Sequence, residues 1–233
     1  MKICIFSDIH GNLPAFEAAY PLILKESADV NLFLGDLCGY YFDEFAVWEK
    51  LRTIPRLIAL KGNHDEMFLS AADGNAGALE ESSAKYGPAI KFFLNKNHTD
   101  MIAWIKKLPS SWEGPAAICG AYHGSPWDVL KEYIYPDASL KRFRNFRYPW
   151  VFLGHTHYPM DRSEGVVRII NPGSLGQPRD GHWPQFAVVD FSGANVRFRE
   201  VQYDKDMFVR EMRRKVPENH YLYDVIERVG LRE

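Results

Sequence analysis

The residues of this chain that could do chemistry come directly after short apolar runs. The run Arg56–Leu60 leads into Lys61-Gly62-Asn63-His64-Asp65. Short apolar runs bounded by polar residues predict buried β-strands, and open α/β sheets bind ligands beyond the carboxyl ends of their strands. Four further runs end in the same way, at Asp8-Ile9-His10, Asp36, His123 and His155-Thr156-His157. We therefore expect five strands to present two carboxylates, five imidazoles and one amide as potential metal ligands.

These side chains favour a catalytic metal centre. Carboxylate oxygens, imidazole nitrogens and an amide oxygen suit Mn, Fe, Zn, Co or Ni, whereas a structural zinc site usually has a cluster of thiolates. Residues two apart in an extended segment face the same side. Asp8 with His10, and His155 with His157, can therefore each direct two ligands at one centre if the chain stays extended there. The ligand set is large enough for two metal ions with open positions for water and substrate.

Several neighbouring residues allow two interpretations. Asn171-Pro172-Gly173-Ser174 is either a simple turn or a support for the metal site, because it follows a strand near His157. The aromatic residues close to the site could stack on a nucleobase, but we interpret them as packing residues. They are Tyr40, Tyr41, Trp127 and Trp183.

The elements that must position these residues alternate between strand and helix at the start of the chain. Helical spacing of apolar residues predicts a helix over Leu13–Lys25, between strands ending at Asp8 and Gly35, which makes a parallel βαβ unit. A second helix is expected over Glu44–Arg52. Glu66–Lys107 is rich in alanine and predicts two or three helices inserted between strands, a candidate lid. The later expectations are strands over 116–122, 150–154, 166–170, 186–191 and 196–201, a short basic helix over 139–146, and a helical tail over 205–228.

Composition limits the class of protein. The chain has 233 residues, 46% of them hydrophobic, and a formal net charge of -2. This charge gives no reason to expect binding to a nucleic-acid duplex or an anionic membrane. No apolar run approaches the ~18 residues of a membrane helix, and the N-terminus does not have the pattern of a signal peptide. Three cysteines cannot pair completely. We expect a cytoplasmic protein, and the sequence gives no indication of its oligomeric state.

Taken in order, these motifs resemble those of the calcineurin-like metallophosphoesterase superfamily. They are Asp8-x-His10, Gly35-Asp36, Gly62-Asn63-His64-Asp65, His123-Gly124 and Gly154-His155-Thr156-His157. The segment Asn171–Arg179 is similar to that of the small bacterial and archaeal phosphodiesterase branch. The resemblance implies an α/β fold, a four-layer α/β/β/α sandwich with two mixed sheets. The sequence shows no internal repeat and no low-complexity linker, which favours a single domain over residues 1–233 with a helical cap inserted at about 66–108.

The resemblance also implies a function for each residue of the motifs. Position by position, Asp8, His10 and His157 would hold the first metal, Asn63, His123 and His155 the second, and Asp36 would bridge both. His64 would contact the phosphate or the leaving group, and Asp65 would orient His64. Relatives often have a longer loop after the aspartate of the Gly-Asp motif. Here Gly39 follows Asp36 closely, a departure that concerns the substrate and not the metal site.

The implied activity is that of a phosphoric ester hydrolase with two divalent metal ions, of which Mn is favoured over Fe, Zn, Ni or Co. A hydroxide bridging the ions would attack a small phosphodiester or a nucleotide. The alternatives are a phosphomonoesterase, including a protein phosphatase, or a non-catalytic interaction scaffold of the same fold. A scaffold need not keep His64 and all seven ligands, and this chain keeps them.

Overall fold

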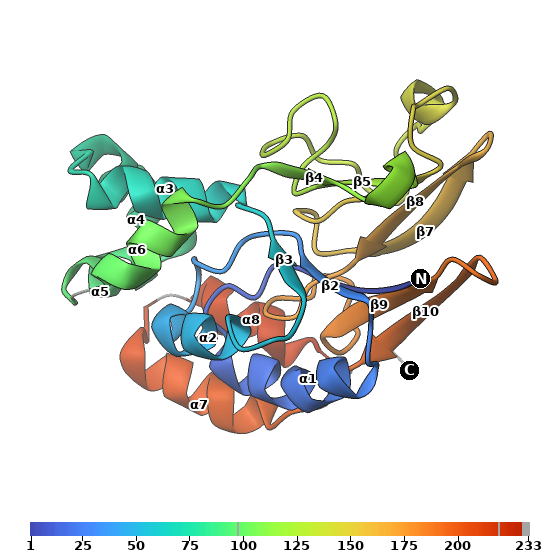
Figure 1. Cartoon of the computed structure of the whole chain (residues 1–233). Helices are drawn as coiled ribbons and strands as arrows, with labels where there is room; N and C mark the ends of the chain where they lie inside the picture. The colour runs from blue at the N-terminus through green and yellow to red at the C-terminus, as the bar shows by residue number, and fades with distance from the viewer. Residues whose placement is uncertain (97, 219, 230–233) are drawn as a thin grey trace.

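The structure is a computed structural model that describes residues 1–96, 98–218 and 220–229. It contains two five-stranded sheets, which face each other (Figure 1). The first sheet has the order β10-β9-β1-β2-β3 and the second the order β4-β5-β6-β8-β7. The first sheet comprises β1 (Lys2–Phe6), β2 (Val30–Phe33), β3 (Leu57–Ala59), β9 (Gln185–Asp190) and β10 (Asn195–Glu200). The second comprises β4 (Ser111–Glu113), β5 (Cys119–Tyr122), β6 (Trp150–Phe152), β7 (Pro159–Glu164) and β8 (Val167–Pro172). In the first sheet β10-β9-β1 pair antiparallel and β1-β2-β3 pair parallel. In the second sheet the pairs β5-β6 and β6-β8 are parallel, and the two edge pairs are antiparallel. The expected sandwich of two mixed sheets is therefore confirmed.

Alternation along the strands separates two cores. In β1, Ile3 and Ile5 pack between the sheets with residues such as Phe152. Cys4 and Phe6 point to the opposite face, where they pack against helices. Successive side chains of a strand point to opposite faces, so a wholly buried β1 must be apolar throughout. This is why the run reads as continuously apolar and not as alternating.

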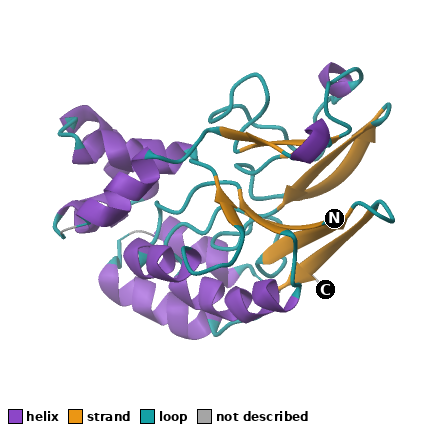
Figure 2. Cartoon of the chain, in the orientation of Figure 1, coloured by secondary structure: helices purple, strands orange, loops and turns teal. Residues whose placement is uncertain are grey.

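Helices cover the outer face of the first sheet (Figure 2). They are α1 (Leu13–Lys25), α2 (Glu44–Leu51), α7 (Lys205–Lys215) and α8 (His220–Glu227). Over the second sheet the outer layer is an irregular segment, with Leu140, Phe143 and Tyr148 packed on strand residues. The helix expected over 139–146 is therefore wrong in extent, because only a 3-10 turn over Lys141–Phe143 forms.

A group of four helices stands at one end of the sandwich (Figure 1). They are α3 (Asn63–Ala72), α4 (Ala76–Tyr86), α5 (Ala89–Leu94) and α6 (Thr99–Lys106). The sequence indicated two or three helices starting at Glu66. The helical segment starts at Asn63 instead, so His64 and Asp65 lie in the first turn of α3. The side chain of Asn75 caps α4 by accepting a hydrogen bond from the amide of Ala78, which explains why α3 and α4 are separate.

The second sheet contains two strands that the sequence did not predict. β4 is three residues long, and β7 is an edge strand with charged side chains. Short length and charged residues limit the pairing of an edge strand with other chains. They also leave no apolar run from which the sequence could predict a strand. The strand expected from residue 116 begins only at Cys119, after a 3-10 turn over Pro115–Ala117. Within the three described ranges, no helix is long and apolar enough to cross a membrane.

Candidate metal centre

The structure brings the seven candidate ligands together where the strands of both sheets end. One group contains Asp8, His10 and His157, and another contains Asp36, His123 and His155. The potential ligand atoms of each group lie within 4.8 Å of one another, and all six residues are buried. Asn63 joins the second group, because its Oδ1 lies 2.9 Å from Nε2 of His123. The resemblance assigns the first group to one ion, Asn63, His123 and His155 to the other, and Asp36 to both. A third group with suitable spacing, His10, Asp36 and His64, overlaps the other two.

The chain is not extended at these residues. Five of the seven candidate ligands have positive φ angles between 51° and 67°, namely Asp8, His10, Asp36, His155 and His157. The condition that the chain stays extended at Asp-x-His and His-x-His is therefore not met, and the turns themselves direct these side chains at one place. A left-handed conformation costs roughly 1–2 kcal/mol for a residue with a Cβ, and such strain gathers at functional sites. Hydrogen bonds between loops hold these turns, such as that from the amide of Asp8 to the carbonyl of Gly35 at 3.0 Å.

Backbone carbonyls orient three of the imidazoles. Nδ1 of His10 lies 2.8 Å from the carbonyl oxygen of Cys38. Nδ1 of His157 lies 2.7 Å from that of Gln177, and Nδ1 of His123 lies 3.0 Å from that of Leu34. A carbonyl can only accept a hydrogen bond, so each Nδ1 carries a proton, and a ring in its neutral form keeps a lone pair on Nε2. Metal-binding histidines are commonly held in this way.

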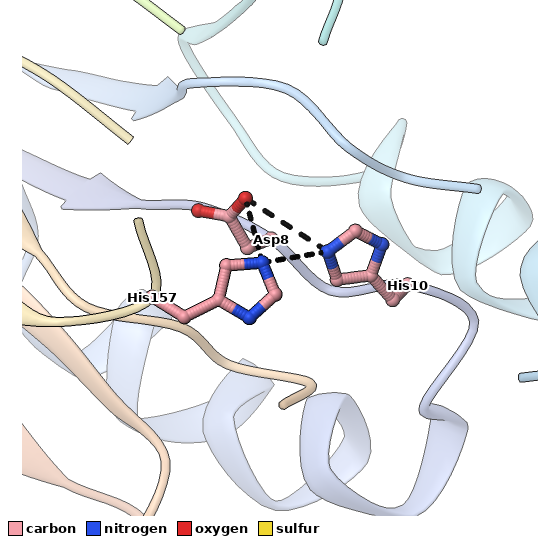
Figure 3. Close-up of side chains that lie close together, drawn as sticks. All are labelled: Asp8, His10 and His157. Atoms are coloured by element: carbon pink, nitrogen blue, oxygen red, sulfur yellow. Dashed lines mark hydrogen bonds and ion pairs between the residues drawn. The ribbon is translucent and has the colours of Figure 1, made fainter. Parts of the chain in front are cut away.

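The potential ligand atoms of the first group are arranged as in a cation-binding site. Nε2 of His10 and Nε2 of His157 lie 3.0 Å apart (Figure 3), yet with both protons on Nδ1 neither nitrogen can donate to the other. Oδ1 of Asp8 lies 3.4 Å from Nε2 of His157 and 3.9 Å from Nε2 of His10, and it has no hydrogen-bond donor among the described residues. Three electron-rich atoms thus converge in a buried space, where a cation would relieve their repulsion.

The second group also brings a carboxylate oxygen close to imidazole nitrogens, and its Asp36 lies next to the first group. Oδ2 of Asp36 lies 3.3 Å from Nε2 of His123 and 3.7 Å from Nε2 of His10. This oxygen is buried and, like Nε2 of His155, has no hydrogen-bond partner in the described part of the chain. Asp36 therefore faces one imidazole from each group, the position that a bridging ligand requires.

Burial and mutual interactions set the charges of these groups. Burial by itself would raise the pKa of Asp8 and of Asp36, but nearby imidazoles hold both pKa values well below the ordinary range. Burial lowers the pKa of His10 and His157, and that of His155 to about 3. These carboxylates are charged and these imidazoles neutral at pH 7, which are the forms that bind metals.

His123 differs from the other imidazoles. Burial favours its neutral form, yet the carboxylates of Asp36, Asp8 and Asp65 together outweigh burial and raise the pKa of His123 to about 9. Positive charge is therefore favoured at its Nε2, between the oxygens of Asp36 and Asn63. That is also where a cation would be stabilised.

The structure separates His64 from Asp65. The amide of His64 donates to Oδ1 of Asp36 at 2.8 Å, but its buried Nδ1 has no partner among the described residues. The carboxylate of Asp65 instead accepts three backbone hydrogen bonds, from Asp36, Cys38 and Gly62 at 2.9–3.0 Å. The expectation that Asp65 orients His64 is therefore corrected, because Asp65 holds the loop that carries Asp36. The ring of His64 packs against Tyr40 and Tyr86.

Side chains of the segment 171–179 hold the backbone of the loops that carry the site. Oγ of Ser174 donates to the carbonyl of Asp8 at 2.7 Å, and Nδ2 of Asn171 donates to the carbonyl of Gly154 at 2.7 Å. Of the two interpretations of this motif, the structure thus favours support for the site. The sequence indicated Tyr40 only as a packing residue near the site and Arg179 only as the end of this segment. Arg179 donates to the hydroxyl of Tyr40 at 2.9 Å, and the ring of Tyr40 packs against His10.

Comparisons with known proteins place this chain among phosphoesterases. The sequence profile of the calcineurin-like phosphoesterase superfamily domain matches residues 1–194. The chain is 25% identical to the phosphodiesterase YfcE of Escherichia coli, over 82% of this chain and 88% of that protein. It is 27% identical to the uncharacterized protein MJ0912 of Methanocaldococcus jannaschii, over 93% of this chain and 94% of that protein. A metallophosphoesterase from Sphaerobacter thermophilus has a similar crystal structure, with a TM-score of 0.78, 28% identity, and coverage of 97% of this chain and 99% of that one.

Proposed function

Because this chain belongs to the calcineurin-like phosphoesterase superfamily, we propose that it is a phosphodiesterase that hydrolyses small phosphodiesters or nucleotides with two divalent metal ions. Family membership supports hydrolase activity on phosphoric esters. The preference for diesters is inferred from the likeness to the phosphodiesterase YfcE.

In the proposed site each residue has one task. Asp8, His10 and His157 would hold one ion, Asn63, His123 and His155 the other, and Asp36 both. When bound, divalent ions supply Lewis acidity toward the phosphate and lower the pKa of water. The carbonyls of Cys38, Gln177 and Leu34 keep three imidazoles in the tautomer that can bind these ions.

His64 is proposed to act on the substrate and not on the metals. It lies next to Asn63 in α3, and its buried Nδ1 has no partner among the described residues. An imidazole at this position can donate a hydrogen bond to an oxygen of the phosphate in the transition state. Asp65 would act indirectly, by fixing the loop that bears Asp36.

The observation that carries the proposal is the distance of 3.0 Å between Nε2 of His10 and Nε2 of His157. Two lone pairs cannot face each other at this distance in a buried space without a cost that a shared cation removes. The presence of Asp8 at the same place adds the negative charge that such a cation needs.

A reconstitution panel tests the proposal. Metal-free protein is loaded with Mn, Fe, Zn, Ni, Co or Mg and assayed with bis(p-nitrophenyl) phosphate and with p-nitrophenyl phosphate. We expect the diester to be cleaved faster, and His157→Ala to lose both bound metal and activity. His182→Ala is the matched control, since His182 is partly exposed and pairs with Glu200. Faster cleavage of the monoester would favour a phosphomonoesterase, and metal binding without hydrolysis of either ester would favour a scaffold.

A further inference from the structure

A pocket of about 510 Å³, lined in part by two arginines, lies beside the metal centre. Arg179, Arg228, Asp180, Tyr158 and Tyr221 are among the residues that line the pocket. Tyr158 follows His157 directly in the chain, so the pocket adjoins the first ligand group. None of its described lining residues is a candidate metal ligand, whereas Asn63 and His155 line a separate cleft of about 440 Å³.

Arg179 is held in place but its charge is not balanced. It is two residues from Gln177, whose carbonyl contacts Nδ1 of His157. Its Nη2 donates to two neutral oxygens, the hydroxyl of Tyr40 at 2.9 Å and Oε1 of Gln177 at 3.3 Å. Its Nε is buried and has no acceptor, and Arg179 forms no ion pair with any described residue. A guanidinium partly removed from water without an anion is unfavourable.

The neighbouring charges do not supply that anion. Asp180 lines the same pocket but forms no ion pair with Arg179: its Oδ1 accepts a hydrogen bond from the amide of His182, and its buried Oδ2 has no hydrogen-bond partner among the described residues. Its carboxylate offsets only one of the two guanidinium charges in the pocket wall. Arg228 adds a second guanidinium to the pocket wall. Metal ions at the adjacent centre would add further positive charge, and like charges at short range repel each other. An anionic ligand would satisfy both the free Nε and the excess positive charge.

We propose that Arg179 binds a second phosphate of the substrate, distinct from the phosphate that is hydrolysed. This rests on the proposed function, and it narrows the substrate to small phosphodiesters that carry another phosphate. The scissile phosphate must lie over the metal ligands, and the pocket of Arg179 lies beside them. Arginine suits phosphate because its planar group of donors matches the phosphate oxygens. Tyr158 and Tyr221 provide aromatic walls on which a base or sugar between the two phosphates can pack.

A binding measurement tests the subsite without catalysis. Metal-free protein is titrated with pyrophosphate by calorimetry, for the wild type and for Arg179→Gln, Arg179→Lys and Arg210→Gln. We expect Arg179→Gln to weaken binding by about tenfold to a hundredfold, as for the loss of hydrogen bonds to a charged group. Arg179→Lys should lie in between, which excludes misfolding as the cause. Arg210 is exposed and does not line the pocket, so Arg210→Gln should bind like the wild type. Unchanged binding by Arg179→Gln would overturn the proposal.

A matched pair of substrates tests the same subsite in turnover. Thymidine 5′-(p-nitrophenyl phosphate) is compared with the same ester carrying a 3′-phosphate, so the leaving group is identical. The wild type should prefer the second ester, and Arg179→Gln should lower kcat/KM for it at least tenfold more than for the first, mainly through KM. Equal losses on both esters would place Arg179 on the scissile phosphate and overturn the subsite while leaving the phosphodiesterase intact. If no metal restores hydrolysis but Arg179→Gln still weakens pyrophosphate binding, the subsite stands and the proposed function fails.

Discussion

Replacing Gly62 by alanine should disrupt the metal centre, because the new Cβ would lie too close to Asp36. A Cβ at residue 62 would lie 2.1 Å from Oδ1 of Asp36 and 2.4 Å from its backbone nitrogen, where ordinary van der Waals contact begins at 3.4 Å. Gly62 has φ -98° and ψ 177°, a conformation open to alanine, so the clash and not backbone strain forbids a side chain. Asp36 or the start of α3 must therefore move by about 1 Å to restore normal contacts.

The consequences can be estimated from that displacement. A misplacement of about 1 Å in a catalytic arrangement costs roughly 10²-fold in rate. Overpacking of a well-packed site costs about 1–3 kcal/mol in the free energy of unfolding, which lowers Tm by roughly 2–4 °C per kcal/mol in a chain of this size. We expect Gly62→Ala to lose bound Mn, to cleave bis(p-nitrophenyl) phosphate about 10²-fold more slowly, and to unfold at a lower temperature. Metal content, kcat/KM and calorimetric Tm measure the three effects.

Gly193→Ala is the matched control, because a Cβ there would meet no described atom within 4 Å. Gly193 lies in the turn between β9 and β10, and alanine at a compatible position stabilises by about 0.4–1 kcal/mol by restricting the unfolded chain. If Gly62→Ala keeps the metal content and rate of the wild type and a Tm like that of Gly193→Ala, the close approach of Gly62 to Asp36 does not constrain the site.

Three further predictions concern other residues. Protein loaded with excess Mn should contain two ions per chain by elemental analysis. Asp36→Asn should retain less metal after dialysis than Asp8→Asn, because Oδ2 of Asp36 faces both ligand groups. If Asp8→Asn retained less metal than Asp36→Asn, a bridging role of Asp36 would be excluded. His64→Ala should keep its metal but lose about 10²–10³-fold in kcat, with a larger loss on a nucleotide diester than on a nitrophenyl diester, since an alkoxide leaves less readily; loss of metal would instead make His64 a ligand. Burial raises the pKa of Glu44 to about 7, so the folded state binds this proton more tightly and stability should fall as the pH rises from about 4.5 through 7. In urea unfolding, Glu44→Gln should therefore stabilise by on the order of 2–3 kcal/mol at pH 8 and by much less at pH 5; equal effects at both pH values would contradict this reasoning.

The sequence by itself determined which residues could bind metals and where they stand along the chain. Short apolar runs that end in Asp8, Asp36 or His123 are a local signal, because a buried strand must be apolar and its end must leave the sheet. The helix over Leu13–Lys25 was predicted with the bounds that the structure shows, since helical spacing and the Asn12 cap are also local. The order of the motifs was enough to indicate the family, which the match over residues 1–194 shows.

Only the tertiary structure decided how those residues meet. The left-handed turns at Asp8 and His155 are held by bonds between segments far apart in the sequence, such as that from the amide of His155 to Oδ2 of Asp8. His10 and His157 likewise come close together although they lie in loops that follow strands of two different sheets. Propensity and periodicity describe a residue and its near neighbours, so they cannot report such contacts. The same limit applies to Arg179, whose lack of an ion pair within the described part of the chain becomes visible only in the tertiary structure.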